Sequence, residues 1–134
     1  MKTSDMKDAA LNWAVGVAEG LQWQNDDPEV GLYHRRDHQY RNDRLVPNDL
    51  DYYIMDDYNL TLYSPSTDWA FGGPIIEREG ITIARRGKHS WSEWGAVLND
   101  FEFDEEGTTP LIAAMRCYVA SKLGDNIDIP KELT

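Results

Sequence analysis

The sequence has little of several features that would reveal a function directly. Its 134 residues contain one cysteine, Cys117, so no intramolecular disulfide can form, which suits a reducing cytoplasm. It holds no CxxC pair or Cys/His cluster, which argues against a structural zinc site. No stretch approaches the roughly 20 apolar residues of a membrane span, and the first residues lack the apolar stretch of a secretory signal. We therefore expect a cytoplasmic protein.

Positive charge is also scarce. Lysine and arginine total 13 against 24 aspartates and glutamates, for a net charge of −11. Direct binding to nucleic acid or to an anionic membrane needs basic side chains, so both are disfavoured. The acids concentrate in residues 21–63 and 91–109, whereas residues 64–90 are nearly neutral.

Two helices are indicated by apolar residues at helical spacing. The first spans residues 4–19, with Thr3 or Ser4 as its cap and Gly20 at its end. The second begins after the cap Thr109 and ends at Gly124. A shorter helix is predicted to start at a proline, residue 74, and to end at a glycine, residue 80.

Alternation of apolar and polar residues predicts a set of short strands. We place them at residues 21–24, 59–63, 81–85, within 90–103 as one or two strands, and at 127–129. Residues 104–107 are interpreted as an exposed loop, and residues 25–57 as a charged, mobile excursion. Together these elements predict one domain over residues 1–134 with an α+β fold, in which the N-terminal and C-terminal helices pack on a small, mostly antiparallel sheet.

Three segments together carry a resemblance to a known family. They are residues 9–15 with 18–20, residues 63–78, and residues 109–124. In this order they resemble the NinX-like family of phage and prophage proteins, whose function is unknown. Residues 25–62 and 91–107 depart from that pattern. The resemblance implies an accessory phage protein acting in the cytoplasm of a bacterial host, and it supplies no established catalytic residues.

A polar loop and the helix after it form the first candidate site. Hydroxyls and free backbone N–H groups could surround an anion, an indole could stack on a flat ring, and an arginine could bind phosphate. The residues concerned are Ser64, Ser66, Thr67, Asp68, Trp69, Gly72, Gly73 and Arg78, joined by Arg116 from the last helix. The same residue types also serve turns and helix caps, and the glycine spacing and lysine of a nucleotide-binding P-loop are absent.

A run of acids forms the second candidate site. It could imitate the phosphates of DNA and occupy a basic groove on a partner protein. It could equally be a solvated loop or strand edge, where charge discourages aggregation. The calcium-loop pattern does not fit, because its glycine would come too late. The residues are Asp100, Glu102, Asp104, Glu105 and Glu106.

No catalytic or metal site is predicted. Cys117 has the character of a small core residue, and no base is placed beside it by the sequence. His34 and His38 lie four residues apart, but the segment has no helical period and no glutamate follows the first histidine.

Three functions follow from these observations. The first is non-enzymatic binding of a small anionic or nucleotide-like ligand. The second is inhibition of a basic host protein, such as a defence factor, by an acidic and DNA-mimicking surface. The third, an enzyme acting on a nucleotide-like ligand, is disfavoured because no nucleophile–base pair is recognisable. No cofactor is expected, and a homo-oligomer is compatible with the sequence.

Overall fold

The computed structural model describes residues 1–20, 53–56, 59–86 and 94–129. The strand predicted at residues 21–24 and most of the excursion predicted at residues 25–57 lie outside this part. The elements in chain order are a 3-10 turn η1 (Thr3–Asp5), α1 (Asp8–Ala18), β1 (Tyr53–Asp56), β2 (Asn59–Leu62), α2 (Trp69–Glu79), β3 (Thr82–Arg85), β4 (Trp94–Leu98), β5 (Phe103–Gly107) and α3 (Pro110–Leu123).

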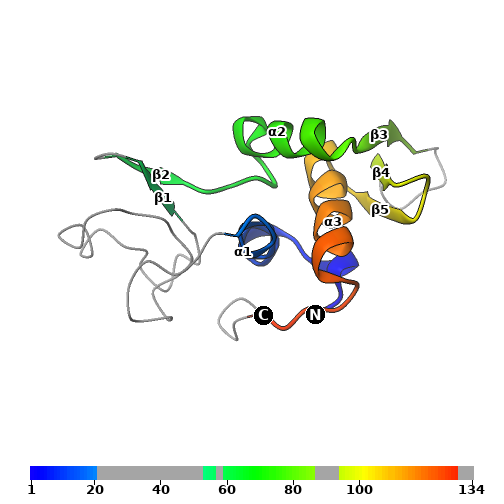
Figure 1. Cartoon of the computed structure of the whole chain (residues 1–134), viewed down its shortest axis with the longest axis horizontal. Helices are drawn as coiled ribbons and strands as arrows, with labels where there is room; N and C mark the ends of the chain where they lie inside the picture. The colour runs from blue at the N-terminus through cyan, green and yellow to red at the C-terminus, as the bar shows by residue number, and fades with distance from the viewer. Residues whose placement is uncertain (21–52, 57–58, 87–93, 130–134) are drawn as a thin grey trace.

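Helix α3 is the centre of the fold. It packs against β3, β4 and β5 on one side and against α1 and α2 elsewhere (Figure 1). Its start is as predicted: the Thr109 hydroxyl accepts a hydrogen bond from the backbone N–H of Ile112 at 3.1 Å, and Pro110 follows as the first helical residue. Buried side chains surround most of the helix, because other elements cover it on several sides.

The sheet under α3 has three antiparallel strands in the order β3-β4-β5. Ile83 pairs with Ala96, which pairs with Glu105. Because paired residues of an antiparallel sheet share a face, these three point to the same side. β1 and β2 form a separate antiparallel ladder. The predicted α+β architecture, with helices packed on an antiparallel sheet, is confirmed.

Strand β5 corrects the prediction of a loop at residues 104–107. The residues that face inward are Phe103, Glu105 and Gly107. Only one of them is a large apolar residue, so the sequence does not show the alternation that indicates a strand. Gly107 is essential to the packing, because a Cβ added there would lie 2.6 Å from the backbone nitrogen of Ala113. The ladder with β4 forms the strand, and glycine at position 107 lets its end approach α3 closely.

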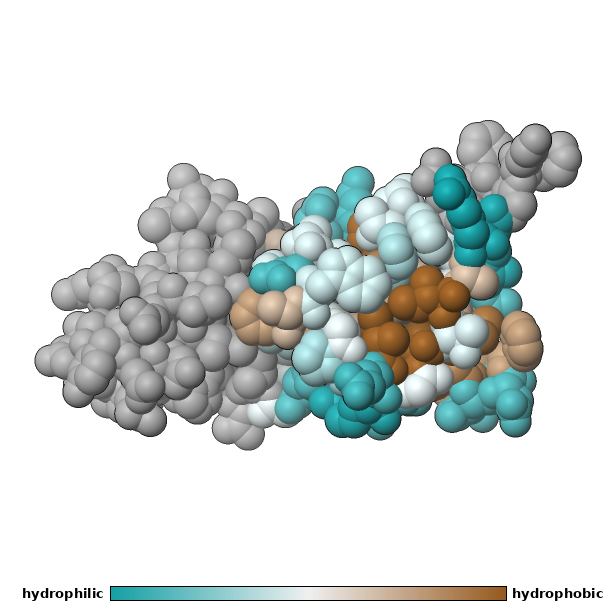
Figure 2. Space-filling view, turned by 90° about the horizontal axis from the view of Figure 1, so that it is seen from above, coloured by the Kyte–Doolittle hydropathy of each residue, from teal (hydrophilic) through white to brown (hydrophobic). Residues whose placement is uncertain are grey.

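Helix α2 begins earlier than predicted. Asp68 caps it by accepting a hydrogen bond from the Ala70 N–H at 2.9 Å, so Pro74 lies inside the helix and not at its first residue. Gly80 ends the helix in the left-handed conformation, as predicted, with φ of 72°. Seen from above, hydrophobic side chains gather in one patch on this face of the described part (Figure 2). Ile76 of α2 and Ile83 of β3 are partly buried against the core.

The N-terminal segment also differs from the prediction. Thr3 does not cap a helix over residues 4–19; its buried hydroxyl donates to the Gly124 carbonyl at 2.7 Å, and α1 begins only at Asp8. The strand expected at residues 127–129 is replaced by a single bridge between Lys2 and Asn126. The start of the chain is thereby held beside the end of α3.

Candidate functional site

The loop before α2 uses its polar groups to hold the fold together. The Asn12 side-chain oxygen accepts two hydrogen bonds from Ser66, one from its N–H at 3.0 Å and one from its hydroxyl at 2.7 Å. Ser66 is 1% exposed and Asn12 is 8% exposed. The Ser64 carbonyl accepts from the N–H groups of Thr67 and Asp68, which closes the turn. Four groups that were predicted to bind a ligand, namely the N–H and hydroxyl of Ser66 and the N–H groups of Thr67 and Asp68, therefore have partners within the protein.

The two glycines of α2 have different surroundings. A Cβ on Gly72 would lie 2.5 Å from Leu111 Cδ2 and 2.6 Å from the Pro65 carbonyl oxygen, so this glycine allows α2 to pack closely on α3. A Cβ on Gly73 would lie 3.9 Å from the ring of Trp69, an ordinary contact. Trp69 itself is 54% exposed.

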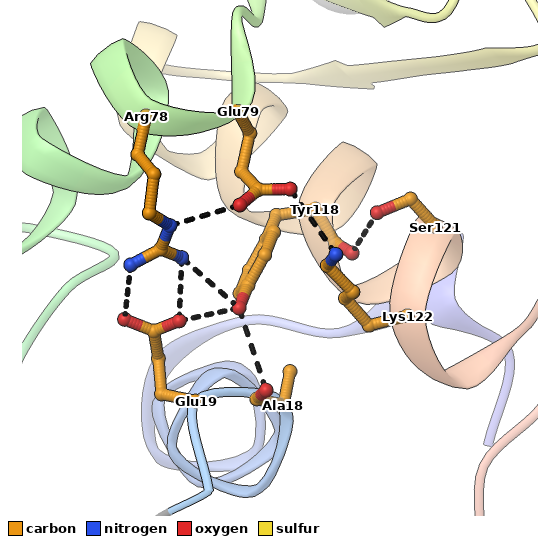
Figure 3. Close-up of polar contacts among 7 residues, drawn as sticks. All are labelled: Ala18, Glu19, Arg78, Glu79, Tyr118, Ser121 and Lys122. Carbon is orange, nitrogen blue, oxygen red and sulfur yellow. Dashed lines mark hydrogen bonds and ion pairs between the residues drawn. The ribbon is translucent and has the colours of Figure 1, made fainter.

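Arg78 does not share a pocket with Trp69. The two are nine residues apart on one helix, and nine steps of about 100° place them on opposite faces. Arg78 donates from one guanidinium nitrogen to Glu19 Oε2 at 2.6 Å, from another to Glu19 Oε1 at 3.1 Å, and from Nε to Glu79 Oε2 at 2.8 Å (Figure 3). An anion would have to displace these carboxylates to bind there.

Tyr118 extends this cluster into the core. Its hydroxyl donates to the Glu19 carboxylate and accepts from Arg78 at 3.2 Å, while Lys122 pairs with Glu79 at 3.2 Å (Figure 3). Burial raises the pKa of Glu19, but hydrogen bonds from Arg78 and Tyr118 outweigh burial and hold that pKa below its usual value. The cluster joins the ends of α1 and α2 to the side of α3.

Arg116 lies in the second candidate site and not in the first. It donates to the Met6 carbonyl at 2.7 Å and to the Glu106 carbonyl at 2.8 Å. The prediction that Arg116 joins the loop at residues 64–68 is therefore wrong. It lines a cavity of about 350 Å³ together with Ser4, Asp5, Asp104, Glu105 and Glu106. Trp69, Arg78 and Arg116 thus face three different surroundings.

The acidic run lies in the turn after β4 and in the three central residues of β5. Asp100 and Glu102 are exposed on the turn, and Asp104 and Glu106 are exposed on the strand face that points away from α3. These four residues are called the acidic face below. Glu105 points the other way and is half-buried. Burial, followed by the charge of Asp125, raises the pKa of Glu105, and the nearby Arg116 opposes this shift.

One base reaches across the outer side of the sheet to the acidic face. Arg86 pairs with Asp104 at 2.5 Å, and its side chain passes over β4 at Gly95. A Cβ on Gly95 would lie 1.8 Å from Arg86 Nε, so only glycine leaves room for this crossing. Asp104 is therefore partly neutralised, while within the described residues no ion pair involves Asp100, Glu102 or Glu106.

Cys117 has the properties of a core residue. It is fully buried, its thiol contacts the Phe103 carbonyl at 3.6 Å, and burial raises its pKa to about 12. A thiol with so high a pKa is a poor nucleophile at neutral pH. His34 and His38 lie outside the described residues. Within the described part, no three His, Cys, Asp or Glu side chains are grouped to hold a metal ion, and no helix is long and apolar enough to cross a membrane.

Some residues that organise the site were not singled out from the sequence. Asn12 gave a signal, because it is a lone amide in the apolar run of α1. Glu19 gave none, since a carboxylate beside a terminal glycine is common on exposed helix ends. Its partner Arg78 is 59 positions away, so no local pattern connects them.

Comparison with known proteins gives the relationship of the whole chain. No curated protein matches it. The family model described as bacteriophage P22, NinX matches residues 2–122. That range includes the first two segments on which the resemblance was based, all but the last two residues of the third, and every described helix and strand except the last residue of α3. The chain therefore belongs to the bacteriophage P22 NinX family.

Proposed function

We propose that this phage protein works as a binding protein whose acidic face docks on a basic protein of the host cell, such as a defence factor. The observation that supports this proposal is the arrangement of Asp100, Glu102, Asp104 and Glu106. All four are exposed, and all lie on one β-hairpin. The net charge of −11 would steer the protein toward a positively charged partner.

The strand geometry suits a partner that recognises a row of negative charges. Outward residues on a strand recur every two positions, about 7 Å apart. Asp104 and Glu106 have this spacing, and the turn residues continue the charge beyond the strand. Within the described part of the chain, β5 is an edge strand, so the row stands at a margin of the sheet. A basic groove that normally holds nucleic acid is the partner surface favoured by this chemistry.

The geometry gives less support to the small anionic or nucleotide-like ligand. The Ser66 hydroxyl and the capping carboxylate of Asp68 have internal partners, and the three side chains expected to hold such a ligand do not converge. Nothing in the described residues assembles a nucleophile with a base, so we do not propose an enzyme.

The test is capture of host proteins by matched variants. Glu102→Gln/Glu106→Gln removes two charges from the acidic face, and Glu77→Gln/Asp128→Asn removes two exposed charges elsewhere. We expect the first variant to weaken the captured complex at least about tenfold and to reduce its salt slope between about 50 and 200 mM, and the second to leave both unchanged. Duplex DNA should compete for the partner.

Two results would contradict the proposal. One is an equal loss of capture in both variants, which would show an effect of net charge alone. The other is capture that does not change with salt.

A further inference from the structure

The turn between β4 and β5 holds an uncommon backbone conformation. Asn99, Asp100 and Phe101 have φ angles of 54°, 55° and 71° in succession. Asparagine and aspartate tolerate the left-handed region, but a bulky phenylalanine is unfavourable there. Such a conformation persists only when the surrounding structure enforces it, and it is most often found where a side chain must be presented in a particular way.

Phe101 is presented to solvent by this turn. It is 71% exposed, more than Trp69 or Met1, the other exposed large apolar residues of the described chain. Exposed aromatic residues at interfaces commonly act as anchors for a partner side chain. The strained turn and the exposed ring therefore point to the same role.

A cavity of about 280 Å³ is lined in part by Phe101. It is lined by Thr82 and Val97, which are paired across β3 and β4, and by Leu98, Asn99, Asp100 and Phe101 at the end of β4 and in the turn. Ligand sites for drug-sized molecules begin at roughly 300 Å³. The space is therefore large enough for one long side chain.

We propose that this turn cavity receives an arginine side chain from the basic partner, an inference that rests on the proposed function. The aliphatic stem of arginine would lie against Val97, as long basic side chains do on apolar surfaces. Its flat guanidinium would stack on the Phe101 ring and meet the Asp100 carboxylate. The neighbouring acidic face supplies the charge complementarity that selects a cation over an apolar residue.

Chemical-shift titration with single amino-acid probes tests the cavity itself. N-acetyl-arginine amide should shift the backbone signals of Thr82 and residues 97–101 saturably. The citrulline analogue has nearly the same shape without the charge, and it should bind at least about fivefold more weakly. Phe101→Ala should weaken arginine binding about two- to fivefold, and Asp100→Asn should do the same. Trp69→Ala, at an exposed aromatic elsewhere, should have no effect.

The outcomes separate this inference from the proposed function. No saturable shift with the arginine probe, or equal binding of arginine and citrulline, would overturn the cavity assignment. The cavity assignment would also be overturned if Phe101→Ala and Asp100→Asn still captured the partner while Glu102→Gln/Glu106→Gln did not. That result would leave the proposed function standing. Loss of capture in Phe101→Ala, with thermal stability retained, would support the arginine site.

Discussion

Replacing Asn12 by alanine should destabilise the protein by about 2–4 kcal/mol. The Asn12 oxygen is the acceptor for both the N–H and the hydroxyl of Ser66, and both residues are buried. A buried donor left without an acceptor costs about 1–3 kcal/mol, and this substitution orphans two donors. The loss would fall on the contact that ties α1 to the loop before α2.

A double-mutant cycle separates the hydrogen bonds from simple loss of packing. Ser66→Ala alone should cost about 1 kcal/mol, because Asn12 keeps its bond from the backbone N–H of residue 66. In the Asn12→Ala background the same substitution removes an orphaned hydroxyl, so it should cost little. The double variant should therefore lose about 1 kcal/mol less stability than the sum of the losses in the two single variants.

Urea unfolding followed by tryptophan fluorescence measures these free energies. Each kcal/mol should also lower the melting temperature by about 3–6 °C for a domain of this size. Thr67→Ala is the control, since Thr67 is exposed and adjacent, and it should change stability by less than about 0.5 kcal/mol. Additive effects within about 0.3 kcal/mol would refute the assignment of a shared acceptor.

Two further perturbations test the cluster of Figure 3 and the packing of β5. The pKa of Glu19 in the folded protein lies below its usual value of 4.5. The charged carboxylate therefore stabilises the fold above about pH 4.5, and this stabilisation is lost as the pH falls through the pKa of the folded state. Glu19→Gln should lower the melting temperature at neutral pH and flatten its fall below about pH 4.5; an unchanged pH profile would argue against the cluster. Gly107→Ala should cost about 1–3 kcal/mol or more, because its Cβ would meet the backbone of α3. Gly73→Ala is the matched control, with room for a Cβ and a gain of about 0.5–1 kcal/mol from helix propensity, and equal urea midpoints for the two variants would contradict this reasoning.

Much of the fold could be read locally. Helix α3 has its cap, its first proline and its terminal glycine in sequence, and β2 and β3 show the alternation of half-buried strands. Such signals work because helix and strand periods depend on residues a few positions apart. The family relationship and the excess of acid were also accessible from the sequence alone.

The remainder depended on contacts between distant segments. β5 carries acidic residues where a loop was predicted, and its pairing with β4 and its packing on α3 through Gly107 are visible only in the tertiary structure. The candidate sites depended on tertiary structure even more strongly. The partner of a charged side chain is chosen by what the fold brings near it: Arg78 meets Glu19 across 59 positions, and Arg116 meets Met6 across 110. The sequence by itself determined the elements and the charge, whereas the tertiary structure alone decided which charges are paired and which remain at the surface.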